Sequence, residues 1–141
     1  MVSYSFLSNP TKNQIHEIIR LYQTEKWWEG ESDNPETVKK IISGSHCFAI
    51  ATKNDAIIGM GRAISDRVSD AYIQDVTVMP AFRGEKIGSR IIGMIIEKLN
   101  QDGIGWIGLI AEKNANAFYE PHGFSVMPNA APMLRKTTND L

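Results

Sequence analysis

The first third of the chain carries the apolar spacing of two amphipathic helices. Apolar residues recur at i, i+3, i+4 and i+7 between about residues 12 and 26, which is the period of a helix with one face on a core. Thr11 and Gln14, at the start of this segment, have the spacing of a capping box. Asn34 followed by Pro35 is typical of the start of a second, shorter helix.

The apolar period changes to that of β-strands after residue 46. Residues 47–51 and 56–64 predict two strands joined by a tight polar turn, and residues 71–79 predict a third strand. Gly59 and Gly61 inside the second strand predict a bulge or a close approach of another backbone. The middle of the chain therefore predicts an antiparallel sheet.

The last third of the chain alternates between the two periods. In order, the pattern predicts a helix, a buried strand, a short helix and two final strands, over residues 87–100, 106–110, 113–120, 124–127 and 133–136. A weakly alternating segment at residues 1–7 is expected to form an edge strand. This order of elements predicts an α+β or α/β fold, with an antiparallel front and a strand–helix–strand crossover behind it.

Composition indicates a single globular domain over residues 1–141. A formal net charge of −1 argues against a nucleic-acid partner, which needs an excess of basic side chains. Because no apolar run reaches the roughly 20 residues that span a bilayer, we expect no membrane association and a cytoplasmic protein. Cys47, the single cysteine, has apolar neighbours and is interpreted as a buried small hydrophobic residue rather than a reactive thiol.

Candidate chemistry begins where the third predicted strand passes through a glycine-containing turn into the long helix. The start of such a helix presents unpaired backbone N–H groups and a partial positive charge, so it can bind an anion. Gly84 and Gly88 let a phosphate approach the backbone, while Arg83 adds charge. Ser89 offers a hydroxyl. The turn matches neither a Walker loop nor the dinucleotide fingerprint, and a plain strand-to-helix turn is the alternative interpretation.

A second motif, at residues 115–124, reads Ala-Asn-Ala-Phe-Tyr-Glu-Pro-His-Gly-Phe. Together with the turn over residues 83–88, it resembles the GCN5-related N-acetyltransferase (GNAT) family. That family has a turn of the form Arg/Gln-x-x-Gly-x-Gly/Ala and, some thirty residues later, Ala-x-x-Phe/Leu-Tyr-x-x-x-Gly-Phe. Lys86 stands where the family usually has glycine, and Glu112 stands where it often has asparagine. Pro121 ends the last helix early.

The resemblance implies a fold and a cofactor. The fold is a GNAT-type mixed, mostly antiparallel sheet flanked by helices on both faces, with a V-shaped splay between two central parallel strands. The cofactor is acetyl-CoA (coenzyme A) as acyl donor, without a metal. Its pantetheine arm would bind along the splayed strand and its pyrophosphate on the turn. The implied cofactor-binding residues are Val76, Thr77, Val78, Arg83, Gly84, Glu85, Lys86, Ile87, Gly88, Ser89 and Tyr119.

The resemblance also implies the catalytic groups of an N-acetyltransferase in which a primary amine attacks the thioester directly. The Val76 backbone N–H is then the donor to the developing oxyanion. Tyr119 is the general acid that protonates the leaving sulfur, and a tyrosine that only packs in the core is the alternative. For the whole chain, the alternative is a non-catalytic acyl-CoA-binding sensor or partner module with the same fold.

Asp75 is the candidate catalytic base. It precedes the cofactor-binding backbone, and strand alternation predicts that its side chain shares a face with Ile73 and Thr77. An aspartate among apolar neighbours needs a partner or a function. A structural ion pair with Arg62 is the alternative.

The acceptor is assigned to the end of the first helix, where Glu25, Trp27, Trp28 and Glu29 follow closely on one another. Residues 12–36 hold six acidic and three basic side chains, whereas residues 82–98 hold four basic and two acidic ones. Such a division would steer a cationic amine to one mouth of a cleft and anionic CoA to the other. We therefore expect a small-molecule or exposed amine acceptor, with homodimer formation left open. Helix-packing tryptophans and a merely solvated acidic face are the alternatives.

Overall fold

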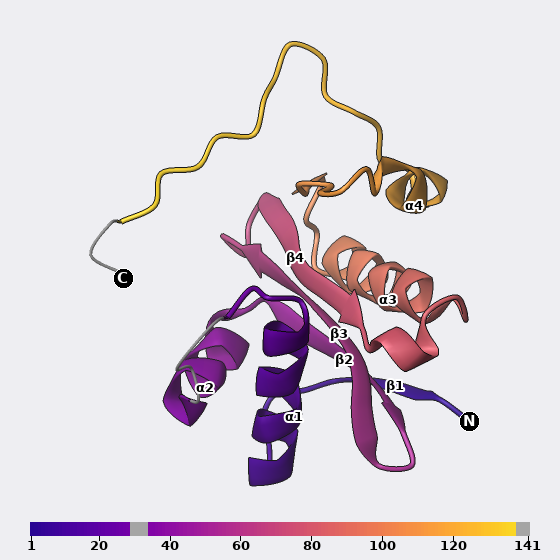
Figure 1. The fold of residues 1–141 in the computed structure, drawn as a ribbon. Helices are drawn as coiled ribbons and strands as arrows, with labels where there is room; N and C mark the ends of the chain where they lie inside the picture. Colours follow the sequence, from indigo (N-terminus) through magenta and orange to yellow (C-terminus); the bar gives the residue numbers. More distant parts are fainter. Residues whose placement is uncertain (29–33, 138–141) are drawn as a thin grey trace. The chain divides into compact units, whose positions relative to one another are not determined.

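The computed structural model describes residues 1–28 and 34–137, and the chain divides into two compact units, Met1–Leu109 and Ile110–Leu141. Within the first unit, helices α1 and α2 cover one face of a β-sheet and helix α3 covers the other (Figure 1). The second unit holds a short helix followed by a long extended segment (Figure 1). The predicted site residues are divided between the two units, and a single domain over the whole chain stays a prediction.

Over the residues that the structure describes, the sheet contains five strands in the order β1-β2-β3-β4-β5. Their bounds are Ser3–Phe6, Cys47–Lys53, Ala56–Ser65, Asp70–Val78 and Trp106–Gly108. The first four strands pair antiparallel, and β4 pairs with β5 in parallel. Helix α3 (Ile87–Gln101) makes the crossover between the two parallel strands. The predicted mixed, mostly antiparallel sheet is confirmed, but the parallel pair lies at the end of the sheet rather than at its centre.

The two helices on the first face begin where their capping residues predict. Helix α1 spans Lys12–Thr24 and starts with the complete capping box of Thr11. Helix α2 spans Pro35–Gly44, and the Asn34 side chain accepts hydrogen bonds from the first backbone N–H groups. Helix α1 ends two residues earlier than predicted, because Lys26 adopts φ 63°, which a right-handed helix cannot contain.

Large and small side chains are divided between the two faces of the sheet. Phe48, Ile50 and Met60 belong to the core beneath α1 and α2. On the opposite face, Gly59 and Gly61 of β3 lie against Ile91 of α3, so the helix packs close to the sheet. A Cβ added to Gly61 would lie 2.9 Å from the Ile91 Cγ2 atom. The sequence predicted a bulge or a close backbone approach here. The register shift between Met60 and Arg62 shows the bulge, whereas the close neighbour of Gly61 is a helix side chain.

A bulge interrupts β4 opposite Gly61. Met60 pairs with Thr77 and Arg62 pairs with Gln74, so β4 has one residue more than β3 over this stretch. The bulged strand places Asp75 in the left-handed region, at φ 59°. The sequence predicted that the side chains of Asp75, Ile73 and Thr77 share one face of the sheet, and this prediction is wrong for Ile73. Asp75 and Thr77 reach helix α1, whereas Ile73, which pairs with Ala63, lies on the α3 face.

The strand after α3 is shorter and more exposed than predicted. β5 has three residues, and its first, Trp106, is 41% exposed. The prediction of a buried strand is wrong because, among the described residues, no further strand covers the outer edge of β5. The parallel ladder ends at Tyr72 and Gly108, while β4 continues to Val78. Beyond Tyr72 this edge of β4 therefore has no strand partner within the described part of the chain.

The second unit differs most from the sequence expectation. Helix α4 spans only Asn116–Tyr119, and a 3₁₀ turn over Glu120–His122 follows it. Lys113 and Asn114 have positive φ, so the helix cannot start where the sequence predicts it. The two final strands are wrong: residues 124–127 and 133–136 form no strand. Alternation stabilises a strand only where a neighbouring strand completes its hydrogen bonds.

Candidate active site

The turn between β4 and α3 holds two residues with positive φ at the start of the helix. After the 3₁₀ turn over Pro80–Phe82, Gly84 adopts φ 85° and Lys86 adopts φ 64° at the N-cap of α3. No side chain of the described part of the chain caps this end of the helix, and the first N–H groups of a helix have no partner within it. A Cβ at Gly84 would meet no atom within 4 Å. The binding of a phosphate group by this backbone stays a prediction.

Arg83 is held by the protein itself. Its Nε donates a hydrogen bond of 2.8 Å to the Val78 carbonyl, and its guanidinium lies 2.7 Å from the Glu25 carboxylate. Glu25 also accepts a hydrogen bond from the Thr77 hydroxyl. The structure thus joins residues predicted for the cofactor, Arg83 and Thr77, to one predicted for the acceptor. This cluster ties the end of α1 to the start of the turn.

The open edge of β4 presents backbone groups beside this turn. The Met79 amide donates to the Ile58 carbonyl in β3. Because the backbone groups of successive strand residues point to opposite edges, the N–H and C=O of Val78 point to the other edge of β4. The Arg83 bond to the Val78 carbonyl agrees with that direction. A cofactor arm that pairs with β4 would have to share or displace this bond.

Asp75 lies in a partly buried polar network. One of its carboxylate oxygens accepts hydrogen bonds from Arg62 Nε at 2.6 Å and from the Tyr22 hydroxyl at 2.7 Å. The ion pair with Arg62 that the sequence suggested as the alternative is therefore present. The role of Asp75 as a base stays a prediction.

Tyr22 is a member of this network that sequence reasoning missed. Burial raises the pKa of its hydroxyl above the usual value, and the neighbouring Asp75 carboxylate raises that pKa further. The helical spacing counted Tyr22 only as an apolar core residue. The available signal was a hydroxyl in an otherwise aliphatic stripe, since a buried hydroxyl needs a polar partner.

The two tryptophans differ in their surroundings. Trp28 stacks on the Tyr22 ring, with centroids 4.2 Å apart and planes 6° from parallel, and it packs against the α1/α2 core. Trp27 meets the same ring edge-on at 6.1 Å and is 38% exposed. Trp28 thus packs against the core, and Trp27 offers the more accessible ring. A role of either tryptophan in binding the acceptor stays a prediction. Glu29 lies outside the described residues.

Tyr119 lies in the second unit, within an aromatic cluster. Its ring meets Phe118 at 4.9 Å and Phe124 at 6.0 Å, both nearly perpendicular. Burial raises the pKa of its hydroxyl, and the negative charge of Glu112 raises it further. The hydroxyl therefore keeps its proton at neutral pH, as a proton donor must. Within residues 1–28 and 34–137, no group of three or more His, Cys, Asp or Glu side chains could hold a metal ion.

Comparisons with known proteins give the class of protein to which this mixed sheet, with its parallel pair and crossover helix, belongs. A family model described as "Acetyltransferase (GNAT) domain" matches residues 7–132. The chain is 34% identical to the "Uncharacterized N-acetyltransferase ycf52" of Porphyra purpurea over 131 residues, which cover 88% of this chain and 72% of the relative. The chain therefore belongs to the GNAT family, and it is an acetyltransferase of that type.

Solved structures share this fold at low sequence identity. A GNAT family acetyltransferase from Streptococcus pneumoniae superposes with a TM-score of 0.77 at 20% identity, covering 98% of this chain and 99% of the other. The glucosamine-6-phosphate N-acetyltransferase of Arabidopsis thaliana superposes with a TM-score of 0.71 at 18% identity, covering 98% and 99%. At these identities the likeness concerns the fold.

Proposed function

We propose that the chain transfers the acetyl group of acetyl-CoA to a primary amine. The observation that carries the proposal is the open edge of β4 leading into the Gly84–Lys86 turn and the uncapped start of α3. An extended arm can add to such an edge, and a pyrophosphate suits a helix N-terminus. The GNAT family uses acetyl-CoA, and these residues fit it.

Cofactor binding then falls to the backbone more than to side chains. The amides at the start of α3 would hold the pyrophosphate, with the N-cap residue Lys86 beside them. Val76 and Val78 would bind the pantetheine arm through their backbone groups. Arg83 would act indirectly, because its contacts with Glu25 and the Val78 carbonyl fix the turn.

The transfer itself requires a hydrogen-bond donor to the developing oxyanion, a general base and a general acid. Bound acetyl-CoA supplies an activated thioester. The Val76 amide donates a hydrogen bond toward the acetyl carbonyl oxygen, where negative charge develops. Asp75 accepts the proton of the attacking amine, and the Tyr119 hydroxyl gives its proton to the departing sulfur. The new bond is an amide, and the products are the acetylated amine and free CoA.

The acceptor is a small or exposed cationic amine under this proposal. Trp27, with its accessible ring, can hold an ammonium group by cation–π contact, and Glu25 lies close by in sequence. The glucosamine-6-phosphate N-acetyltransferase that shares this fold is named for a small amine substrate. Helices of the described part are too short or too polar to cross a membrane. A cytoplasmic location and the absence of metal, membrane and nucleic-acid partners stay predictions.

Replacing Tyr119 with Phe tests the proposal. We expect Tyr119→Phe to lower turnover by about ten- to a thousandfold, because one proton-transfer group is lost. Affinity for acetyl-CoA should change little, since the ring is retained. Release of free thiol with a panel of amines measures turnover, and a calorimetric titration measures binding.

Tyr4→Phe is the matched control, because Tyr4 lies on β1, away from the β4 edge. Its turnover should equal that of the parent. Parent-like thiol release from Tyr119→Phe would remove Tyr119 from the mechanism. A parent protein that binds acetyl-CoA but releases no thiol with any amine would favour the non-catalytic CoA-binding module.

A further inference from the structure

Two carboxylates lie where helix α1 meets strand β4, and each is paired with an arginine. Asp75 accepts a hydrogen bond from Tyr22 of α1 and lies 2.6 Å from Arg62 Nε. Glu25, at the end of α1, lies 2.7 Å from the guanidinium of Arg83. The candidate base and the Glu25 carboxylate therefore share one boundary between helix and strand, but their arginines are not held equally firmly.

The Arg62 guanidinium is enclosed by several partners. Besides its carboxylate, it donates to the Ser45 hydroxyl at 3.3 Å and to the Gln74 side chain at 3.5 Å, and the Arg62 side chain is only 14% exposed. Arg83 contacts its carboxylate and the Val78 carbonyl, and its side chain is 52% exposed. An exposed ion pair contributes little to stability, because water can replace either partner at small cost. Arg83 is therefore the arginine that a ligand can displace.

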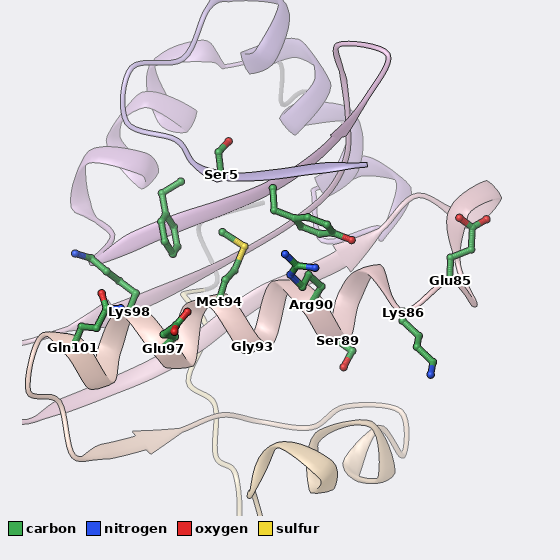
Figure 2. Close-up of a pocket in the computed structure, with 12 residues that line it drawn as sticks. Ser5, Glu85, Lys86, Ser89, Arg90, Gly93, Met94, Glu97, Lys98 and Gln101 are labelled. Atoms are coloured by element: carbon green, nitrogen blue, oxygen red, sulfur yellow. The ribbon is translucent and has the colours of Figure 1, made fainter. Parts of the chain in front are cut away.

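The Arg83 side chain occupies an edge that the cofactor needs. Its Nε donates to the Val78 carbonyl, and under the proposed function the pantetheine arm binds the same backbone group. The residues that follow in the turn face elsewhere, since Figure 2 shows Glu85, Lys86 and Ser89 at the groove between β1 and α3. Arg83 does not line that groove, because its side chain reaches back to β4 and α1. Arg83 and the cofactor therefore compete for one hydrogen-bond acceptor.

Glu25 occupies a position that is unfavourable for a carboxylate without a counter-ion. It is the C-cap of α1, where the helix dipole places a partial negative charge. The Thr77 hydroxyl donates a hydrogen bond to the carboxylate, which fixes its position but brings no positive charge. Arg83 supplies that charge in the structure. If Arg83 leaves, Glu25 remains in place and becomes a binding group for another cation.

We propose that Arg83 couples the binding of the cofactor to the binding of the acceptor amine, an inference that rests on the proposed function. Before the cofactor binds, Arg83 occupies the Val78 carbonyl and neutralises Glu25. On binding, Arg83 gives up the carbonyl to the pantetheine arm, and its guanidinium moves from Glu25 to the pyrophosphate, which arginine binds strongly. Glu25 then takes the ammonium group of the acceptor as its new counter-ion. Arg83 is thus a positioning residue, and each ligand raises the affinity for the other by the same factor.

Calorimetric titration with acetyl-CoA alone tests this exchange. Glu25→Gln frees Arg83 for the cofactor, so acetyl-CoA should bind about two- to fivefold more tightly than to the parent. In an Arg83→Gln background, Glu25→Gln should leave the Kd unchanged, because no arginine remains to be freed. Glu36→Gln, which breaks an exposed ion pair with Lys39 on α2, is the matched control and should bind acetyl-CoA like the parent.

The dependence of thiol release on amine concentration, at saturating acetyl-CoA, gives an independent readout. Glu25→Gln should raise the KM for the amine at least about fivefold with little change in kcat, because this ion pair holds the amine equally before and during transfer. Arg83→Gln should not raise that KM, since Glu25 is then permanently free of its arginine. A merely structural role of the pair would instead weaken cofactor binding and lower kcat in both variants.

Three results would overturn the exchange. One is acetyl-CoA binding to Glu25→Gln that is no tighter than to the parent. Another is a gain that persists in the Arg83→Gln background, which would be a general effect of removing a negative charge. The third is a KM for the amine that rises as much in Arg83→Gln as in Glu25→Gln. A parent that does not bind acetyl-CoA at all would remove the proposed function, and the exchange with it.

Discussion

Lys86 holds a backbone conformation that glycine adopts with less strain. Its φ of 64° lies in the left-handed region, which costs a residue with a Cβ about 1–2 kcal/mol. A glycine at this position would avoid that cost. Because glycine is also more flexible in the unfolded chain, part of the gain in folding stability is offset. We expect Lys86→Gly to raise the free energy of unfolding by about 0.5–1 kcal/mol in urea titrations. Acetyl-CoA should bind as tightly as to the parent, or more tightly.

The exposed residue Lys40, inside α2, provides the control for this change. Lys40→Gly should lower the free energy of unfolding by roughly 0.5–1 kcal/mol, since glycine is a poor helix residue. Two outcomes would count against the strain argument at Lys86. One is a loss of stability in Lys86→Gly. The other is weaker, more salt-dependent cofactor binding, which would assign the function of the missing glycine to the lysine ammonium.

Tyr22 makes part of the stability depend on pH. Because its pKa is raised in the folded state, the protonated hydroxyl contributes fully below the unfolded pKa of about 10 and this contribution is lost as pH rises above it. Tyr22→Phe removes a hydrogen bond to a charged carboxylate and should cost about 1.5–3 kcal/mol at neutral pH. The difference between parent and variant should shrink at about pH 10.5. Urea titrations at the two pH values measure it.

Tyr4→Phe serves as the comparison, since its ring stays beside Arg90. It should keep the parent's loss of stability at high pH. If Tyr22→Phe keeps that loss in full, the titration belongs to another group. Cys47 is one such group, because burial raises the pKa of its thiol to about 11.

Single residues show where sequence reasoning succeeds and where it stops. Thr11 and Asn34 were predicted correctly, because a cap depends on neighbours within three residues. Tyr22 was missed and Glu25 was assigned another role, because their partners Asp75 and Arg83 lie more than fifty residues away. A local pattern carries no information about such a partner.

The packing of α3 on the sheet makes opposite predictions for two glycines. Gly61→Ala would place a Cβ 2.9 Å from Ile91, so it should lower the free energy of unfolding by about 1–3 kcal/mol. Gly93→Ala enters open space on the same helix and should raise it by about 0.5–1 kcal/mol. Urea denaturation of each variant gives both values. Equal effects at the two positions would contradict the close packing at Gly61.

Strands were predicted well where their partners are close in sequence. The hairpin of β2 and β3 and the strand β4 lie within two residues of their predicted bounds. The last two strands were predicted from alternation in the same way and are absent from residues 124–136. Alternation gives the faces of a strand but not whether a neighbour exists to complete its hydrogen bonds.

For the whole molecule, cofactor binding should appear as thermal stabilisation. At about one hundred times its Kd, a ligand that binds only the native state adds roughly 2.7 kcal/mol. For a chain of this size that corresponds to a rise in Tm of roughly 5–15 °C. Gly84→Asp should abolish most of the rise, because it places a negative charge in the anion-binding turn. Scanning calorimetry with and without acetyl-CoA measures each shift against the variant's own Tm.

Gly105→Asp adds the same charge where a Cβ also meets open space, but away from the turn. Its Tm should rise with acetyl-CoA as in the parent. An undiminished rise in Gly84→Asp would place the pyrophosphate elsewhere.

At the scale of the whole molecule, the sequence could sum the charges of two segments, acidic at residues 12–36 and basic at residues 82–98. The sequence could not show that Glu25 of the acidic segment forms an ion pair with Arg83 of the basic segment.

The additional residue at Asp75 exchanges the two faces of the sheet for all the β4 side chains that follow it. Before it, the odd-numbered Ala71 and Ile73 face α3; after it, the even-numbered Val76 does so beside Gly61. Deleting one residue from this strand would turn one of these groups of side chains to the wrong face, however well the remaining residues suit a sheet. A substitution leaves the alternation of side chains between the two faces unchanged. β4 can therefore change its side chains one at a time, but it cannot change its length.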